Sequence, residues 1–313
     1  MKVKTKNGDK RSFIGNVIKY RILLLMMLPA VLYVIIFNYI PMLGIVLSFK
    51  KFNYADGILG SPWNGFNNFK FLLASNKLWT LTRNTLLYNL VFITLGIVFQ
   101  VTFAILLSEI TSKMFKKVSQ TLMFLPYFVS WVVVSALVQA LFSYETGVLN
   151  SIIEFFGGER INIYTNQGVW PFLLTAFKLW KETGYGTIVY LASITGIDSS
   201  MYEAADIDGA TTLQKIFKIT LPTIKPTIII MALLAIGQVF RGDFGLFYQL
   251  VGNNAQVLEV ADILDLFTFR TLMTSGDIGM SAASGLYQSV LCFITIMITN
   301  GVIKKIEPDY SLF

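Results

Sequence analysis

The polar stretch 201–222, with the sequence MYEAADIDGATTLQKIFKITLP, has the residue types and spacing expected of a docking element. Ala204 and Ala205 are small, so the backbone or a side chain of another protein can approach them closely. An apolar stripe follows at helical spacing, formed by Leu213, Ile216 and Phe217. A stripe of this kind on a loop in water indicates that another surface covers it. The alternative interpretation is an ordinary capped loop at the protein surface.

The first half of this stretch is expected to form a short helix that ends at a glycine. Ser200 and Glu203 fit the S-x-x-E capping box, in which each side chain binds a free backbone N–H of the other. This pattern predicts a helix from Met201 to about Asp208. Gly209 can then end the helix, because glycine adopts the left-handed conformation without steric cost.

The second half is expected to form another short helix. Thr211 or Thr212 would be its N-cap residue. Pro222 would close it, because proline has no backbone N–H to donate to a helical hydrogen bond. The sequence therefore predicts a helix, a turn and a helix between two long apolar segments.

Catalytic and metal chemistry find few candidate residues in this chain. It contains no histidine, which excludes a histidine-based catalytic dyad and a histidine metal site. Its single cysteine, Cys292, lies within an apolar run and cannot form a disulfide within the chain. The phosphate-binding pattern G-x-x-x-x-G-K-[ST] is absent, so the chain is not an ATPase. We expect no catalytic residue, no metal ligand and no cofactor bound by this chain.

The composition is that of a membrane protein. Of the 313 residues, 55% are hydrophobic and 14% are charged, whereas soluble domains carry about 25% charged residues. Five uncharged runs are long enough, or nearly so, to cross a bilayer: 22–49, 84–108, 118–144, 226–240 and 278–303. A sixth segment, 170–197, is apolar except for Lys178, Lys181 and Glu182. We therefore expect an all-α bundle of six transmembrane helices.

The basic residues indicate orientation in the membrane. The net charge of +7 comes from residues that cluster at the ends of apolar runs, so we expect no nucleic-acid partner. Assigning them by the positive-inside rule places both termini in the cytoplasm. The run 22–49 is too long for a cleavable signal peptide. The expected organisation is a basic cytoplasmic N-terminus (1–21), one transmembrane domain (22–303) that includes the cytoplasmic loop 198–222, and a cytoplasmic tail (304–313).

The stretch 201–222 resembles the EAA motif of the permease subunits of binding-protein-dependent ABC importers. In that motif EAA is followed by three residues, Gly, nine residues, Ile, any residue and Leu-Pro. Every fixed position is matched here, by Glu203-Ala204-Ala205, Gly209, Ile219 and Leu221-Pro222. Other segments, such as SPWNGFNNFKFL and WKETGYGTIVYLASITGID, are similar to carbohydrate permeases, most of all to the polysaccharide or lipoprotein-type sugar permease branch. The resemblance implies the type I ABC importer permease fold.

The resemblance also implies partners and a bacterial cytoplasmic membrane location. The motif would form a coupling helix in a cleft of a cytoplasmic ATPase, with Glu203 paired to a basic residue of that ATPase. The implied docking residues are Glu203, Ala204, Ala205, Asp208 and Gly209. The implied partners are a second homologous permease, two ABC ATPase subunits that bind ATP and Mg, an extracellular solute-binding lipoprotein and membrane lipid. The subunits would move between inward-facing and outward-facing states by alternating access.

A sugar is the expected cargo. The other spans have no ionisable group near their centres, which argues against an ion-coupled secondary transporter and suits a neutral solute. Sugars bind through hydroxyl hydrogen bonds and aromatic faces, and the candidates on or near the spans are Trp131, Gln139, Tyr185, Tyr190, Gln238 and Tyr287. Each has a structural alternative: an aromatic belt, helix packing or a satisfied polar group. Lys181 and Glu182 lie either at the outer membrane interface or, with Gly184 and Gly186, along an outer vestibule.

The competing hypotheses are a permease for another solute, an ion-coupled transporter and a non-transporting membrane scaffold. One further segment, 241–277, is expected on the outer side. Its apolar stripe predicts an amphipathic helix packed against the bundle, and its members are Val257, Val260, Ile263, Leu264 and Phe267.

Overall fold

The computed structural model describes residues 19–74 and 77–306. The expected N-terminal segment 1–21 and tail 304–313 therefore lie largely outside the described residues. Every regular element in the described part is a helix, and the β-type pairing found there is an isolated bridge between Lys50 and Trp63. The all-α prediction is confirmed.

The helices of the N-terminal half are α2 (Arg21–Val34), η1 (Ile35–Tyr39), α3 (Ile40–Met42), η2 (Leu43–Phe49), α4 (Gly57–Gly60), α5 (Asn67–Ala74), α6 (Lys77–Glu109), α7 (Lys113–Phe124), η3 (Leu125–Phe128), α8 (Trp131–Phe142) and α9 (Val148–Phe155). Those of the C-terminal half are η4 (Gln167–Val169), α10 (Trp170–Thr195), α11 (Ser199–Ile207), α12 (Thr212–Lys215), η5 (Ile216–Thr220), α13 (Leu221–Ile236), α14 (Phe244–Leu250), α15 (Leu258–Ala261), α16 (Leu264–Ser275) and α17 (Ile278–Ile306).

Four helical segments in the described part are long and apolar enough to cross a membrane: 21–49, 77–109, 212–236 and 278–305. A fifth span is formed if α7 with η3 and α8 are taken together, although these two parts are bent by 97° relative to each other. The helix α10 fails the same test, because every 18-residue window of it contains three charged side chains. Length and composition therefore give four or five spans, where the sequence pattern suggested six.

The segment 118–144 is not the single straight helix that its uncharged run predicted. Pro126 lies in the short helix η3, and the chain is extended at Val129. Ser130 then caps α8 by accepting a hydrogen bond from the backbone N–H of Val133. The run contains Pro126 and Ser130, residue types found at a helix break and at a helix N-cap, but the prediction of one straight span rested on the absence of charge alone.

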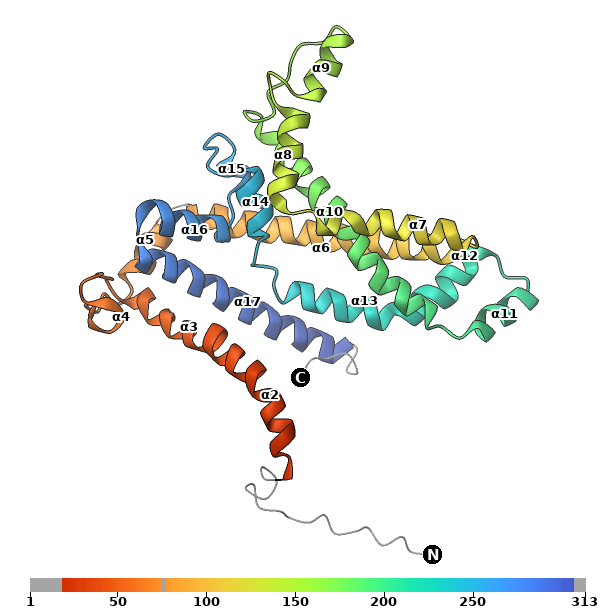
Figure 1. Ribbon diagram of the computed structural model, residues 1–313, viewed down its shortest axis with the longest axis horizontal. Helices are drawn as coiled ribbons and strands as arrows, with labels where there is room; N and C mark the ends of the chain where they lie inside the picture. Colours follow the sequence, from red (N-terminus) through yellow and green to blue (C-terminus); the bar gives the residue numbers. More distant parts are fainter. Residues whose placement is uncertain (1–18, 75–76, 307–313) are drawn as a thin grey trace, which may run out of the picture.

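The long helices form one bundle (Figure 1). Helix α10 packs along α6 and also contacts α7 and α13, and α17 packs against α13. Helices α11 and α12 lie at one end of the bundle, and α4 and α5 lie at the other. One core cluster joins α6, α8, α10 and α14 around Trp170 and Phe247, which are both fully buried. A second joins α6, α10 and α13 around Tyr190 and Ile224. Helix α2 has no residue buried by the rest of the chain.

The segment 241–277 packs against this bundle as its apolar stripe predicted. Val257, Ile263 and Leu264 are fully buried. The stripe does not belong to one helix, however. The chain is extended at Asp262 and Ile263, and this separates α15 from α16.

Helices α7 and α10 approach closely at Gly184. A Cβ atom built there would lie 1.8 Å from the carbonyl oxygen of Met123, which is backbone and cannot move aside cheaply. The contact requires a residue without a side chain, in the way that small residues allow close helix packing in membranes.

Replacing Gly184 by alanine should therefore separate α7 from α10. Overpacking of this kind costs about 1–3 kcal/mol or more. We expect Gly184→Ala to lower the melting temperature of the purified protein in lipid nanodiscs. The matched control is Gly285→Ala in α17, since a Cβ at Gly285 would meet nothing within 4 Å. Equal melting temperatures for the two variants would contradict the close contact.

Candidate docking and translocation sites

The first docking helix, α11, begins earlier than its sequence pattern suggested. Its N-cap residue is Asp198, whose carboxylate accepts the backbone N–H of Ser200 at 3.0 Å. This hydrogen bond lowers the pKa of the Asp198 carboxyl below its ordinary value. Because Ser200 already lies within the helix, the predicted capping box of Ser200 and Glu203 is wrong. Glu203 is exposed, and no hydrogen bond of its carboxylate is found within the described residues.

Gly209 ends α11 as expected. Its φ angle is +72°, in the left-handed region. The N–H of Gly209 donates to the carbonyl of Asp206 at 3.1 Å, and that of Ala210 donates to the carbonyl of Ala205 at 2.9 Å. This pair of hydrogen bonds is the Schellman motif, which satisfies the last carbonyls of a helix. The turn therefore depends on the backbone conformation of Gly209.

The second docking helix is also capped as predicted, but it does not end where expected. Thr211 caps α12 and forms a reciprocal capping box with Gln214. Beyond α12 the backbone widens into the π-helical turn η5 and continues into α13. The expectation that Pro222 closes the helix is wrong, because the π-helical turn just before it lets the helical segment continue through the proline.

Two side-chain contacts join the halves of this docking hairpin, which we define as residues 198–220. Lys215 Nζ lies 2.8 Å from Asp206 Oδ1, and the hydroxyls of Tyr202 and Thr220 are 2.9 Å apart. Of the five predicted docking residues, Ala205 is half-buried. The other four, Glu203, Ala204, Asp208 and Gly209, are exposed. Three large apolar side chains beside them, Ile207, Leu213 and Phe217, are 87%, 66% and 66% exposed. The hairpin thus presents an apolar surface with a carboxylate.

A cavity with polar walls lies between the helices of the bundle, and we call it the polar cavity. It has a volume of about 430 Å³, and its walls come from α6, η3, α10 and α13. Three of the predicted sugar-contacting residues line it, and they are Tyr185, Tyr190 and Gln238. Tyr185 is 46% exposed and stacks on Tyr127, with ring centroids 4.7 Å apart and planes 13° apart. Tyr190 is fully buried, and its hydroxyl has no hydrogen-bond partner within the described residues.

The other three predicted residues do not line the polar cavity. Trp131 packs at the start of α8 against Gly245 of α14. Gln139 lies exposed on α8. The hydroxyl of Tyr287 is 3.1 Å from that of Thr82, which makes it part of helix packing between α17 and α6.

Sequence reasoning missed several polar residues of the cavity wall, namely Asn89, Gln100, Tyr127 and Arg241. Asn89, Gly96 and Gln100 occupy one face of α6 at i, i+7 and i+11 spacing, and this polar stripe within an apolar run would have indicated them. Gln100 also touches α10. A Cβ atom at Gly186 would lie 2.1 Å from its amide carbon.

The charged residues of α10 have partners inside the protein. Lys178, whose side chain is 15% exposed, forms ion pairs with Glu182 and with Asp243, the latter at 2.9 Å. Lys181 donates two hydrogen bonds of 2.6 Å to the backbone carbonyls of Tyr127 and Val129. Lys178 and Glu182 line the polar cavity. Of the two charges considered for the outer vestibule, Glu182 thus lines the polar cavity and Lys181 does not.

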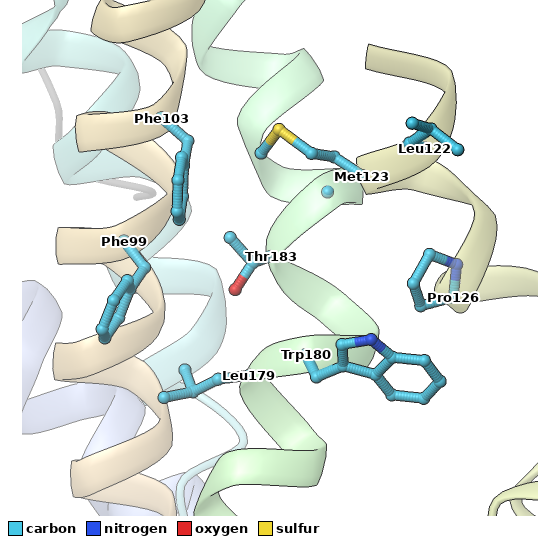
Figure 2. Close-up of a pocket in the computed structure, with 9 residues that line it drawn as sticks. Phe99, Phe103, Leu122, Met123, Pro126, Leu179, Trp180 and Thr183 are labelled. Carbon is cyan, nitrogen blue, oxygen red and sulfur yellow. The ribbon is translucent and has the colours of Figure 1, made fainter. Parts of the chain in front are cut away.

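A second cavity of about 440 Å³ lies on the other side of α10 (Figure 2). Phe99 and Phe103 of α6 face Leu179 and Thr183 of α10 across it, and α7 with η3 forms the third wall. The polar side-chain groups of its lining are the Thr183 hydroxyl and the Trp180 indole N–H, so it lacks the amides and charges that recognise sugar hydroxyls. The polar cavity is the better candidate for a solute.

Comparison with known proteins defines the family. Residues 92–308, more than half of the chain, match the model of the binding-protein-dependent transport system inner membrane component. The chain belongs to this family. Its members are membrane permeases of ABC transporters, and the chain is accordingly a multi-pass protein of the cytoplasmic membrane and not itself an enzyme.

Individual relatives agree with this membership. The chain is 37% identical over 304 residues to the polygalacturonan/rhamnogalacturonan transport system permease protein YteP of Bacillus subtilis (strain 168), covering 97% of this chain and 94% of that one. It is 26% identical to the trehalose/maltose transport system permease protein MalF of Thermococcus litoralis, covering 90% and 92%. A crystal structure of a bacterial alginate ABC transporter, in complex with a periplasmic protein bound to alginate pentasaccharide, contains a chain with a TM-score of 0.85 and 28% identity. The match covers 95% of this chain and 98% of that one. The fold of this permease is thus the type I ABC permease fold.

The docking hairpin provides a direct test of its turn. A β-branched residue at position 209 must adopt a left-handed conformation that costs roughly 1–2 kcal/mol. A Cβ atom at this position would meet nothing within 4 Å, so the strain comes from the backbone alone. We expect Gly209→Val to accelerate hydrogen exchange of the Ala210 amide, measured by mass spectrometry. Gly209→Asn, which tolerates this conformation, should stay close to the unchanged protein, and equal exchange in both variants would contradict the assignment.

Proposed function

We propose that this permease is one of two transmembrane subunits of an ATP-driven importer, and that it carries an oligosaccharide delivered by an extracellular solute-binding lipoprotein. The observation that carries the proposal is the exposed docking hairpin at one end of the bundle, which together with Leu221 and Pro222 matches the EAA motif at every fixed position. ATP and Mg would be bound by two separate ATPase chains. The hairpin would lie in a cleft of one of them, where Glu203 pairs with a basic residue.

In this proposal the chain crosses the membrane six times, with α10 as the sixth span and both termini in the cytoplasm. The inward pairing of its charges supports this role for α10, since paired charges are tolerated within a bundle. Lysines gather where α7 begins, at the end of the bundle that carries α11 and α12, and two more lie at the end of α17, which runs towards that side (Figure 1). The positive-inside rule places that end in the cytoplasm.

The chemistry of the polar cavity supports a sugar as cargo. Its walls offer the stacked rings of Tyr127 and Tyr185, which suit the apolar faces of a pyranose ring. Amide groups from three positions surround them, namely Asn89, Gln100 and Gln238. Amides both donate and accept hydrogen bonds, as sugar hydroxyls do. The relatives that carry galacturonans and maltose or trehalose point to the same class of solute.

An amino-acid, phosphate or peptide permease is the alternative within the same class, and an ion-coupled transporter is the alternative outside it. One observation favours the ion-coupled transporter: Lys178, Glu182 and Asp243 form a cluster of partly buried charges. Lys178 forms an ion pair with each of the two carboxylates, however, so each of the three charges has an opposite charge beside it. A proton carrier needs a group that changes charge during transport.

Reconstitution tests the class of transporter. The permease, its partner permease, the ATPases and the binding protein are placed in vesicles with ATP inside, and uptake of trigalacturonate, arabinotriose and maltotriose is measured. We expect uptake of one sugar that requires ATP and that persists when an ionophore removes ion gradients. Uptake without ATP would overturn the proposal.

In the same vesicles Gly209→Val should abolish most uptake although the subunit inserts, whereas Gly209→Asn should retain it.

The aromatic wall of the cavity predicts a specific loss of affinity. Tyr185→Ala removes a stacking surface worth about 1 kcal/mol beyond simple burial, so the KM for the transported sugar should rise several-fold. The control is Gln139→Ala, because Gln139 is a predicted sugar residue that does not line the cavity. A raised KM in the control and an unchanged KM in Tyr185→Ala would assign the sugar to another place.

A further inference from the structure

The break between η3 and α8 leaves backbone groups without helical partners. The last carbonyls of a helix have no N–H of a following turn to bind. A bilayer supplies no water that could donate a hydrogen bond to them instead. Val129 is extended between the two helices, with φ −72° and ψ 128°. The carbonyl of Pro126 accepts the N–H of Val129, and that of Ser130 accepts the N–H of Val134. The carbonyls of Tyr127 and Val129 are left for another donor.

Lys181 of α10 is that donor. Its ammonium group donates to both carbonyls at 2.6 Å, although the residues lie more than fifty positions apart in the sequence. The same nitrogen lies 5.5 Å from the ring centre of Tyr127 on one side of the break and 5.5 Å from that of Trp131 on the other. Hydrogen bonds from a charged donor are about twice as strong as neutral ones. A single side chain therefore holds both sides of the 97° bend.

The position of Tyr127 connects the hydrogen bonds of Lys181, which we call the Lys181 clamp, to the polar cavity. The Tyr127 ring lines the polar cavity and stacks on Tyr185, which is four residues beyond Lys181 and so on the same face of α10. Helix α10 thus holds the backbone of Tyr127 through Lys181 and its ring through Tyr185. A shift of the Tyr127 backbone would move one ring of the stacked pair against the other.

The neighbouring lysine, Lys178, binds a second break, in this case through an ion pair. Lys178 pairs with Asp243, which is the N-cap of α14, just after the chain leaves α13. Helices α8 and α14 meet where Trp131 packs on Gly245. The two broken segments that border the cavity are therefore both attached to α10, three residues apart.

We propose that Lys181 is a positioning residue of this permease, which caps the broken segment at Tyr127 and Val129 and thereby fixes the aromatic wall that the sugar meets. Lys181 does not itself line the polar cavity. The inference rests on the proposed function for its effect on transport, whereas its effect on the break is independent of that function.

The test uses the complete transporter in vesicles or nanodiscs and compares Lys181→Met with Lys181→Arg. Methionine keeps much of the side-chain volume but removes the donor, whereas arginine keeps the charge and several donors. Lys70→Met changes an exposed lysine of α5 and is the matched control. Hydrogen exchange is measured for the peptide 125–134 and for a reference peptide in α17.

We expect Lys181→Met to accelerate exchange in 125–134 by about tenfold or more, as for the loss of hydrogen bonds to a charged group, with α17 unchanged. The KM for the transported sugar should rise while kcat changes little, and Lys181→Arg should restore both measurements. Unchanged exchange in 125–134, or equal acceleration in α17, overturns the proposal. If Lys181→Met does not assemble, Lys181→Gln, which keeps one amide donor, is judged by the same criteria. Failure of ATP-dependent uptake in the unchanged transporter would refute the proposed function alone, because the exchange result still decides the clamp.

Discussion

Charged side chains within an apolar bundle need partners, and in this permease that requirement is concentrated on α10. Lys178 takes two carboxylates, Glu182 of its own helix and Asp243 of the next break, while Lys181 takes two backbone carbonyls. Apart from Glu182, each partner comes from a place where a helix is interrupted. The cost of burying an ammonium group and the cost of leaving helix-end groups unpaired are thus relieved by the same contacts. This pairing explains why the bend at Val129 and the start of α14 lie beside the same turn of one helix.

Glycines allow these contacts to form at short range. Gly184 brings the backbone of α7 against α10, and Gly186 lets the amide of Gln100 reach the surface of α10. Side chains at either position would push α6 or α7 away and enlarge the distance that Lys181 must bridge. The polar cavity is therefore a consequence of close packing around it. Its walls are two helices held at glycine contacts and two broken segments held by lysines.

The features that could be predicted from the sequence are those that depend on neighbouring residues. The turn at Gly209 and the cap at Thr211 require only a few residues of local context, and both were predictable. The cap at Ser200 failed because Asp198, two residues earlier, binds the same helix start. Pro222 failed because a π-helical turn just before it lets the helix continue through the proline.

Longer-range features were hidden for a different reason. The break at Val129 lies in an uncharged run, and the side chain that binds its carbonyls, Lys181, is remote in the sequence. Of the six residues proposed for the sugar path, three line the cavity: Tyr185 and Tyr190 on α10, and Gln238 just after α13. Residue type was a fair guide there, whereas Trp131, Gln139 and Tyr287 show that type alone does not fix the face of a helix on which a residue lies.

Two of the helices that form the cavity, α10 and α13, also flank the docking hairpin. Helix α10 ends at Thr195, and α11 begins at Ser199 after a short turn. On the other side, α12, η5 and α13 form one continuous helical segment from Thr212 to Ile236. Lys178 and Tyr185 lie on the first helix, and Gln238 and Arg241 lie just beyond the second. In the proposed function, a rigid-body movement of the hairpin would pass along both helices to opposite walls of the cavity. Because the broken segments are attached to α10 by its two lysines, they would move with that wall, and the cavity could change its access while its aromatic surface stays intact.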